Sequence, residues 1–239
     1  MKIIIGRSND GYSYVEQFFY KTYHQLEQLQ IYTSKTYIII EVQLETQLNT
    51  LIKKDQELHD IIIKRGNELI DLGEDNEIAF EIAADEYGGS NFYTEDIINQ
   101  EIINNLTKDN FCKTNIILLY SFIESKILEL CSILKINGNL SIEVSDLKGN
   151  NYIDKGVIYL EKLFNINNTE LANYVFIKNY QRLRNKIVHN GIIKEKDKKF
   201  IEDSYNNFIK VNDNKIFVYS NLISSDLKDK IKCFLLEIV

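Results

Sequence analysis

Two of the four arginines, Arg182 and Arg184, and one of the three histidines, His189, fall within eight residues of this chain. Cleavage of an RNA phosphodiester needs a side chain that exchanges a proton near neutral pH, which histidine does. It also needs a fixed cation for the negative charge that builds on the phosphate, and arginine supplies a planar fork of donors. The spacing of Arg184 and His189 therefore predicts a phosphate-cleaving pair.

The residues around this pair have suitable chemistry for the same reaction. Asn185 can hold the phosphate or orient the imidazole, and Arg182 and Lys186 can contact the phosphate backbone of RNA. This set needs no metal ion and no cofactor. We therefore expect Arg184, His189 and Asn185 to be catalytic, with Arg182 and Lys186 binding substrate.

The charge of the chain is distributed unevenly. The net charge is −7, which argues against a protein whose main task is to coat nucleic acid. Between Lys178 and Lys199, however, eight basic residues stand against two acidic ones, whereas residues 66–101 contain eleven acidic residues and no Lys or Arg. This polarity favours local contact with phosphate.

The cysteines and the apolar runs indicate a soluble, cytoplasmic protein. The chain has three cysteines that are far apart in sequence and form no CxxC pair, which is typical of reduced thiols in the cytosol. The apolar segment at the start is too short for a signal peptide. The longest apolar runs are too short to span a bilayer, so no membrane partner is expected.

The composition and periodicity predict a mainly α-helical fold. Proline is absent, hydrophobic residues make up 44%, and charged residues make up 26%. The periodic patterns predict helices over residues 14–32, 36–72, 111–136, 150–164, 169–189 and 225–239. A β-branched run, residues 37–42, is also compatible with a strand.

Turn residues predict how the chain is divided. Gly73 ends the second helix, and Gly88-Gly89-Ser90-Asn91 is the best candidate for a boundary. Thr169 is the expected N-cap of the helix that ends at His189, with Asn190-Gly191 just after it. Segments 207–211 and 215–219 flank an Asn-Asp-Asn turn and predict a small C-terminal β-hairpin. The lysines after Gly191 are typical of a solvated basic loop.

One family resembles this arrangement. Arg184-Asn185-x3-His189 is similar to the Arg-(polar)-x3-His motif of HEPN domains, which lies at the end of the last core helix in that family. The predicted helix that carries Leu118 to Ser125 resembles an earlier core helix of the family, which often has an acidic residue at the position of Glu124. The resemblance covers residues 110–239 and leaves residues 1–109 as an N-terminal helical extension with the acidic segment.

The resemblance implies a HEPN-like helical bundle that forms a homodimer. Many members of the family are metal-independent endoribonucleases of toxin–antitoxin or anti-phage defence systems, in which infected cells undergo abortive infection. By this resemblance the partners would be RNA, a second copy of the chain and an antitoxin or other protein. Glu124 is a further candidate for substrate binding, with a role in orienting the site. One subgroup has a tyrosine two residues after the histidine that a partner enzyme modifies. This chain has Gly191 there, so that form of control is not expected.

Helix geometry is a separate reason to expect a dimer. Five residues along an α-helix turn by about 500°, so Arg184 and His189 project about 140° apart. A two-fold axis beside the end of the helix would bring two copies into a common cleft.

Three interpretations remain open at this point. The first is the endoribonuclease, and the second is a HEPN-type module that dimerises or binds a partner without cleaving RNA, as an antitoxin or regulator. The third is a helical interaction protein in which Arg184 and His189 simply interact with the last carbonyl groups of their helix. The sequence does not identify the RNA that would be cut.

Overall fold

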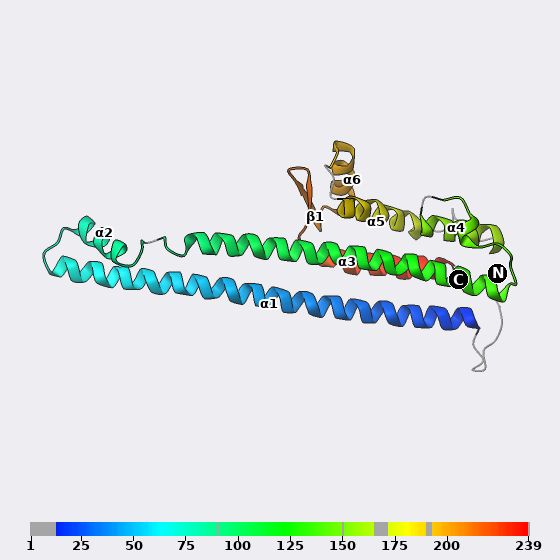
Figure 1. Cartoon of the computed structure of the whole chain (residues 1–239), viewed down its shortest axis with the longest axis horizontal. Helices are drawn as coiled ribbons and strands as arrows, with labels where there is room; N and C mark the ends of the chain where they lie inside the picture. The colour runs from blue at the N-terminus through cyan, green and yellow to red at the C-terminus, as the bar shows by residue number, and fades with distance from the viewer. Residues whose placement is uncertain (1–12, 90, 150, 165–171, 190–192, 239) are drawn as a thin grey trace. The chain divides into compact units, whose positions relative to one another are not determined.

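The computed structural model describes residues 13–89, 91–149, 151–164, 172–189 and 193–238 (Figure 1). Within these ranges the chain is mainly α-helical and has one small antiparallel hairpin, as predicted. The elements are α1 (Tyr14–Asp71), α2 (Asn76–Glu86), α3 (Thr94–Asn137), a 3-10 turn η1 (Val144–Asp146), α4 (Tyr152–Phe164), α5 (Ala172–His189), α6 (Glu195–Tyr205), β1 (Ile209–Asn212), β2 (Lys215–Val218) and α7 (Leu222–Ile238). None of the described helices is both long and apolar enough to be a membrane span.

Helix α1 corrects two of the expectations. The helices predicted over residues 14–32 and 36–72 are one continuous helix, and the strand alternative for residues 37–42 is wrong. Neither glycine nor proline separates the two segments, and the Thr33 hydroxyl donates to the carbonyl of Gln30 at 3.1 Å instead of capping a new helix. The helix ends as predicted at Gly73, whose φ of +99° requires the freedom of glycine.

Helix α3 contains the predicted core helix but begins earlier, at Thr94 instead of near residue 111. The first part of α3 is rich in polar residues, so its apolar residues show no clear helical periodicity. Asn104 donates to the Leu44 carbonyl at 3.3 Å, and Lys108 pairs with Glu41 at 3.0 Å. Contacts with α1 therefore stabilise this segment as a helix, although its pattern of apolar residues does not predict one.

Contacts between residues divide the chain into two compact units. The second unit is Tyr37–Lys108, in which parts of α1 and α3 run antiparallel and α2 packs on α1. Ala79 and Ala83 of α2 are fully buried against Ile62 and Leu69 of α1. The first unit joins Met1–Thr36 with Asp109–Val239. The boundary expected after residue 109 stays a prediction.

The core of the first unit is formed by α3, α4, α5 and α7. The side chains of this core that are fully buried are mostly aliphatic, and each contributes about 1.5–3 kcal/mol on burial. They include Ile116, Leu119, Ile123, Ile127, Leu130, Leu134, Ile153, Leu160, Ile177, Leu183, Leu227, Ile231 and Phe234. Helix α5 is held on α7 by Tyr180, whose hydroxyl donates to Asp226 at 2.7 Å. The orientation of α5 in this core determines where its basic side chains point.

The hairpin of β1 and β2 confirms the prediction made from its turn residues. Ile209 pairs with Val218 and Asn212 with Lys215, and the two residues between the strands, Asp213 and Asn214, have φ values of +47° and +58°. Asn and Asp tolerate this left-handed conformation better than other non-glycine residues. The hairpin is joined to α3 because the Val218 amide donates to Asp109 at 2.7 Å.

Candidate active site

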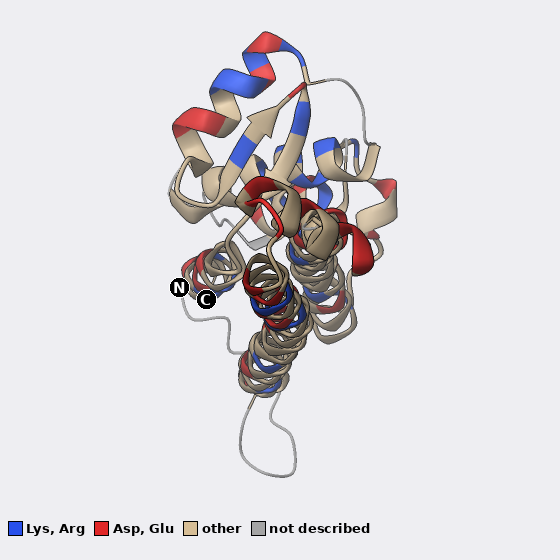
Figure 2. Cartoon of the chain, turned by 90° about the vertical axis from the view of Figure 1, so that its left-hand side faces the viewer, with Lys and Arg blue, Asp and Glu red and all other residues tan. Residues whose placement is uncertain are grey.

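Helix α5 presents its basic side chains on two different faces. Arg182 and Lys186 are four residues apart and share a face, whereas Arg184 is rotated by about 200° from Arg182. The lysines that follow on the chain were expected in a loop, but from Lys196 to Lys199 they belong to helix α6. Acidic and basic residues are mixed along α6, as the red and blue segments of the helix at the top of Figure 2 show, so this helix is not uniformly basic.

Arg182 and Lys186 are both bound by Asp197 of α6. The carboxylate of Asp197 has only 3% exposure and lies 2.7 Å from Arg182 Nη2 and 2.7 Å from Lys186 Nζ. The guanidinium of Arg182 also stacks on the Phe200 ring, 4.0 Å from its centre. The substrate-binding role predicted for Arg182 and Lys186 stays a prediction, and it would require phosphate to displace Asp197.

This cluster allows a prediction about stability. Hydrogen bonds from Lys186 and Arg182 hold the pKa of Asp197 below its ordinary value. A depressed pKa in the folded state adds stability above the pKa of the unfolded chain, and this is lost as the pH falls through the folded value. We expect Asp197→Ala to lower the free energy of unfolding at pH 7 by about 2 kcal/mol.

Urea unfolding at pH 7 and at about pH 3 checks this expectation. The difference in the free energy of unfolding between wild type and Asp197→Ala should become smaller below about pH 4, where the carboxylate becomes protonated. Asp203→Ala is the matched control, since Asp203 is an exposed residue of the same helix and should change stability little. A difference that is equally large at both pH values would show that the ion pairs are not its cause.

Arg184 lacks the kind of ion pair that the other described arginines form. Arg65 pairs with Glu86 at 2.8 Å, and Arg182 pairs with Asp197, but Arg184 forms no ion pair with any residue that the structure describes. Its side chain is half-buried, and its Nε atom is buried without a hydrogen-bond partner among those residues. Burying a guanidinium without a counter-ion costs free energy.

Two residues of the predicted site, Asn185 and Glu124, interact with Arg184. Arg184 Nη1 donates to Asn185 Oδ1 at 3.1 Å, so the amide of Asn185 orients the guanidinium. Glu124 lies half-buried on α3, where burial raises its pKa and the charge of Arg184 partly counteracts that rise. Asn185 thus contacts Arg184 directly, whereas Glu124 interacts with it through charge alone.

His189 is the last residue of α5 and is exposed to solvent. It makes no hydrogen bond or ion pair with the described part of the chain. The five residues from Arg184 correspond to a rise of about 7.5 Å along the helix. Asn190-Gly191 and the expected cap Thr169 lie outside the described residues.

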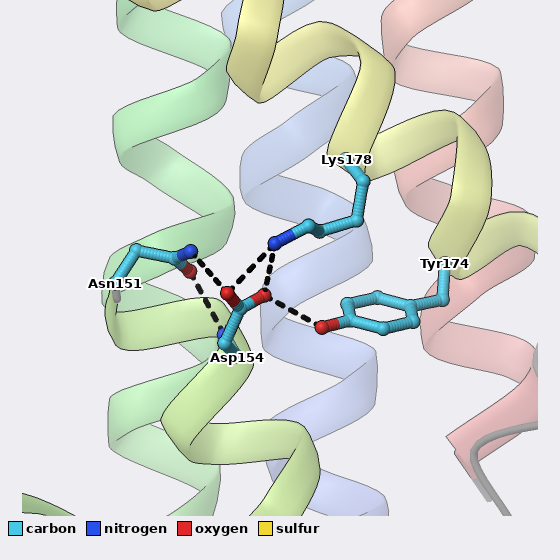
Figure 3. Close-up of polar contacts among 4 residues, drawn as sticks. All are labelled: Asn151, Asp154, Tyr174 and Lys178. Carbon is cyan, nitrogen blue, oxygen red and sulfur yellow. Dashed lines mark hydrogen bonds and ion pairs between the residues drawn. The ribbon is translucent and has the colours of Figure 1, made fainter. Parts of the chain in front are cut away.

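A polar cluster between α4 and an earlier part of α5 was not predicted (Figure 3). Asp154 of α4 accepts hydrogen bonds from the Tyr174 hydroxyl at 2.6 Å and from Lys178 Nζ at 2.7 Å, both on α5. Asn151 reaches the same carboxylate and also accepts from the Asp154 amide at 2.8 Å. The i,i+4 spacing of Tyr174 and Lys178 was a visible signal, but their acidic partner is known only from the fold.

Of two other kinds of site, a metal centre and a hollow, the described residues form only the hollow. The described residues contain no group of three or more His, Cys, Asp or Glu side chains with metal-binding geometry. In the second unit, a hollow of about 280 Å³ is lined by Lys54, Glu57, Leu58, Ile61, Tyr87, Phe92 and Tyr93. None of the predicted site residues lines it.

Comparisons of the chain with family models, curated proteins and solved structures found no match.

Proposed function

We propose that this protein is a metal-independent endoribonuclease of the HEPN type that cleaves RNA with Arg184 and His189. The observation that carries the proposal is the half-buried guanidinium of Arg184, which has no ion-pair partner among the described residues. A cation kept in this way costs stability unless an anion binds to it, and the phosphate of RNA is such an anion. The histidine that the reaction needs is five residues further on the same helix.

Each residue of the proposed site has one role. His189 is the general base or acid, and its exposure at the end of α5 leaves it accessible to substrate. Arg184 stabilises the charge of the transition state, and Asn185 keeps its guanidinium in place through the 3.1 Å hydrogen bond. Glu124, on which the charge of Arg184 acts, helps to orient the site.

The nucleophile in this mechanism comes from the substrate. His189 accepts the proton of the 2′-hydroxyl while the 2′-oxygen forms a bond to the adjacent phosphorus. The bond from phosphorus to the 5′-oxygen breaks, and a protonated histidine returns a proton to that leaving oxygen. The products carry a 2′,3′-cyclic phosphate and a 5′-hydroxyl, and atoms and charge balance without an external reactant.

A homodimer completes the proposal. Arg184 and His189 project about 140° apart on α5, so a second copy beside the end of the helix would supply the facing histidine. In this assembly the first unit is a HEPN-like bundle, and the protein acts in the cytoplasm as a toxin or an anti-phage defence nuclease. An antitoxin or another protein would then control it.

The alternative is a HEPN-type module that binds a partner without cleaving RNA. The binding of Arg182 and Lys186 by Asp197 favours it, because these cations are already neutralised. Inducing the protein alone in cells separates the two functions, since a nuclease toxin should stop growth and a binding module should not.

The proposal is tested with purified protein and a labelled RNA in the presence of EDTA. We expect cleavage to continue in EDTA, and DNA of the same sequence to remain intact because it lacks the 2′-hydroxyl. Analysis of the product ends should find 2′,3′-cyclic phosphate and 5′-hydroxyl groups. Products with 3′-hydroxyl and 5′-phosphate ends would contradict the mechanism.

A further inference from the structure

Helix α3 exposes a row of aliphatic side chains in the second unit. Ile98, Ile102 and Leu106 are spaced four residues apart, so they lie along one face of the helix over about 12 Å. Their exposed fractions are 51%, 51% and 47%. Single exposed aliphatic residues are common on protein surfaces, but a continuous row on one helix face is typical of an interaction surface. We call this row the α3 stripe.

The α3 stripe lies on the side of α3 that is turned away from α1. Asn104 faces α1, because its side-chain amide donates to the carbonyl of Leu44 at 3.3 Å. Ile102 and Leu106 are each two residues from Asn104 and are therefore rotated by about 200° from it around the helix. The pairing of α1 with α3 consequently leaves the stripe uncovered.

The part of the second unit that carries the stripe has little core of its own. Among residues 37–57 of α1 and 94–108 of α3, only Leu44 and Asn104 are buried. Two antiparallel helices cover one narrow face of each other, so apolar side chains on their outer faces need a further element to cover them. A third helix packed on the α3 stripe would remove its side chains from water, which is favourable.

Acidic residues border the α3 stripe. Glu95 and Glu101 lie three residues before and after Ile98, which makes them its neighbours on the helix surface, and both are exposed. Residues 66–107 contain eleven Asp and Glu residues and no Lys or Arg. Among the described residues, the ion pairs of these acids are limited to two, both with Arg65. The carboxylates beside the stripe therefore keep their negative charge available to a partner.

The combination of apolar and acidic side chains determines which kind of partner fits. The phosphates of nucleic acid and the anionic head groups of membranes are repelled by an acidic surface. The same surface of a second copy is also repelled, since a two-fold contact brings identical charges together. A polypeptide segment with a row of apolar side chains between basic ones complements both features, and an amphipathic helix has this arrangement.

We propose that the α3 stripe and its acidic border form a docking surface for a basic amphipathic helix of a partner protein. Apolar side chains of that helix cover Ile98, Ile102 and Leu106, and its Lys and Arg side chains pair with Glu95 and Glu101. The docking surface contains none of the residues of the proposed nuclease site. Its partner can therefore be tested whether or not the protein cleaves RNA.

A synthetic helix of Leu and Lys residues is the probe for this surface. Its Leu residues follow the i, i+4, i+7 spacing of one helix face, and Lys residues occupy the other positions. Two matched peptides separate the contributions, one with Ser in place of Leu and one with Glu in place of Lys. Fluorescence anisotropy of the labelled peptides measures their affinity for the full chain. We expect the Leu/Lys peptide to bind about ten-fold more tightly than either matched peptide.

Substitutions in the stripe locate the binding site. Ile98→Ala and Ile102→Ala remove apolar surface without lowering helix propensity, and together they should lower the affinity for the Leu/Lys peptide about ten-fold. Leu236→Ala is the matched control, because Leu236 has a similar exposure of 57% on α7 of the first unit and should leave the affinity unchanged. Glu95→Gln combined with Glu101→Gln should lower the affinity about five-fold at low salt and much less at high salt.

Three outcomes would overturn the proposal. The first is a Leu/Lys peptide that does not bind, or whose binding the paired substitutions Ile98→Ala and Ile102→Ala leave unchanged. The second is equally tight binding of the Ser/Lys peptide, which would show that charge alone attracts the probe. The third is self-association, measured by light scattering, that the same paired substitutions abolish, because a second copy of the chain would then be the occupant of the stripe.

Discussion

Replacing either Arg184 or His189 by alanine is expected to lower the rate of RNA cleavage by about three orders of magnitude. Each residue supplies a different part of the same transition state, so the double variant should be little slower than either single variant. The measurement is the initial rate of cleavage of a labelled RNA by purified proteins.

The stability of these variants distinguishes a functional role from a structural one. His189 is exposed, and Arg184 has no ion pair among the described residues, so neither replacement should lower the free energy of unfolding by more than about 0.5 kcal/mol. His59→Ala is the control, since His59 is an exposed histidine of the second unit and should leave cleavage unchanged. Unimpaired cleavage by His189→Ala would refute the assignment of this residue.

The largest effect on stability is expected at Gly156, where α4 packs on α3. A Cβ atom at this position would lie 2.1 Å from Ile127 Cγ2 and 3.7 Å from Cys131 Sγ. The Ile127 methyl group is attached to a stiff, branched carbon and cannot turn away easily. We expect Gly156→Val to lower the free energy of unfolding by about 3 kcal/mol through overpacking.

Gly149 offers a matched control for this effect. A Cβ atom there would meet Cγ of Lys155 at 2.8 Å, but Lys155 is flexible, so Gly149→Ala should cost little. Ile127→Ala removes the methyl group that obstructs position 156, so it should make Gly156→Ala less damaging than it is in the wild-type background. Urea unfolding of the single and double variants measures the coupling free energy between the two substitutions. Additive effects would show that the close approach to Ile127 does not cause the loss of stability.

The fold could be predicted where local chemistry decides the structure. The Asn-Asp-Asn turn predicted the hairpin because two of its residues accept a positive φ, and Gly73 predicted the end of α1 for the same reason. The break predicted near residue 33 was wrong because a polar Thr-Ser-Lys segment does not interrupt a helix that is supported by its neighbours. The start of α3 was missed because its stability comes from contacts with α1, such as that of Asn104.

For the candidate site, too, local motifs could be predicted from the sequence, whereas contacts that depend on packing could not. The spacing of Arg184 and His189 and the acidic residue Glu124 could be identified from sequence because they match a motif. The ion pair between Arg182 and Asp197 could not be identified from the sequence, because it depends on how α6 packs beside α5.

The central claim is that the 2′-hydroxyl of RNA is the nucleophile at a site formed by Arg184 and His189. It is tested most directly with an RNA that carries a single 2′-deoxy nucleotide on the 5′ side of the mapped cut. The proposed mechanism predicts that this bond stays intact while other cut sites in the same molecule are still cleaved. Cleavage of the substituted bond at the rate of the all-RNA substrate would contradict the mechanism.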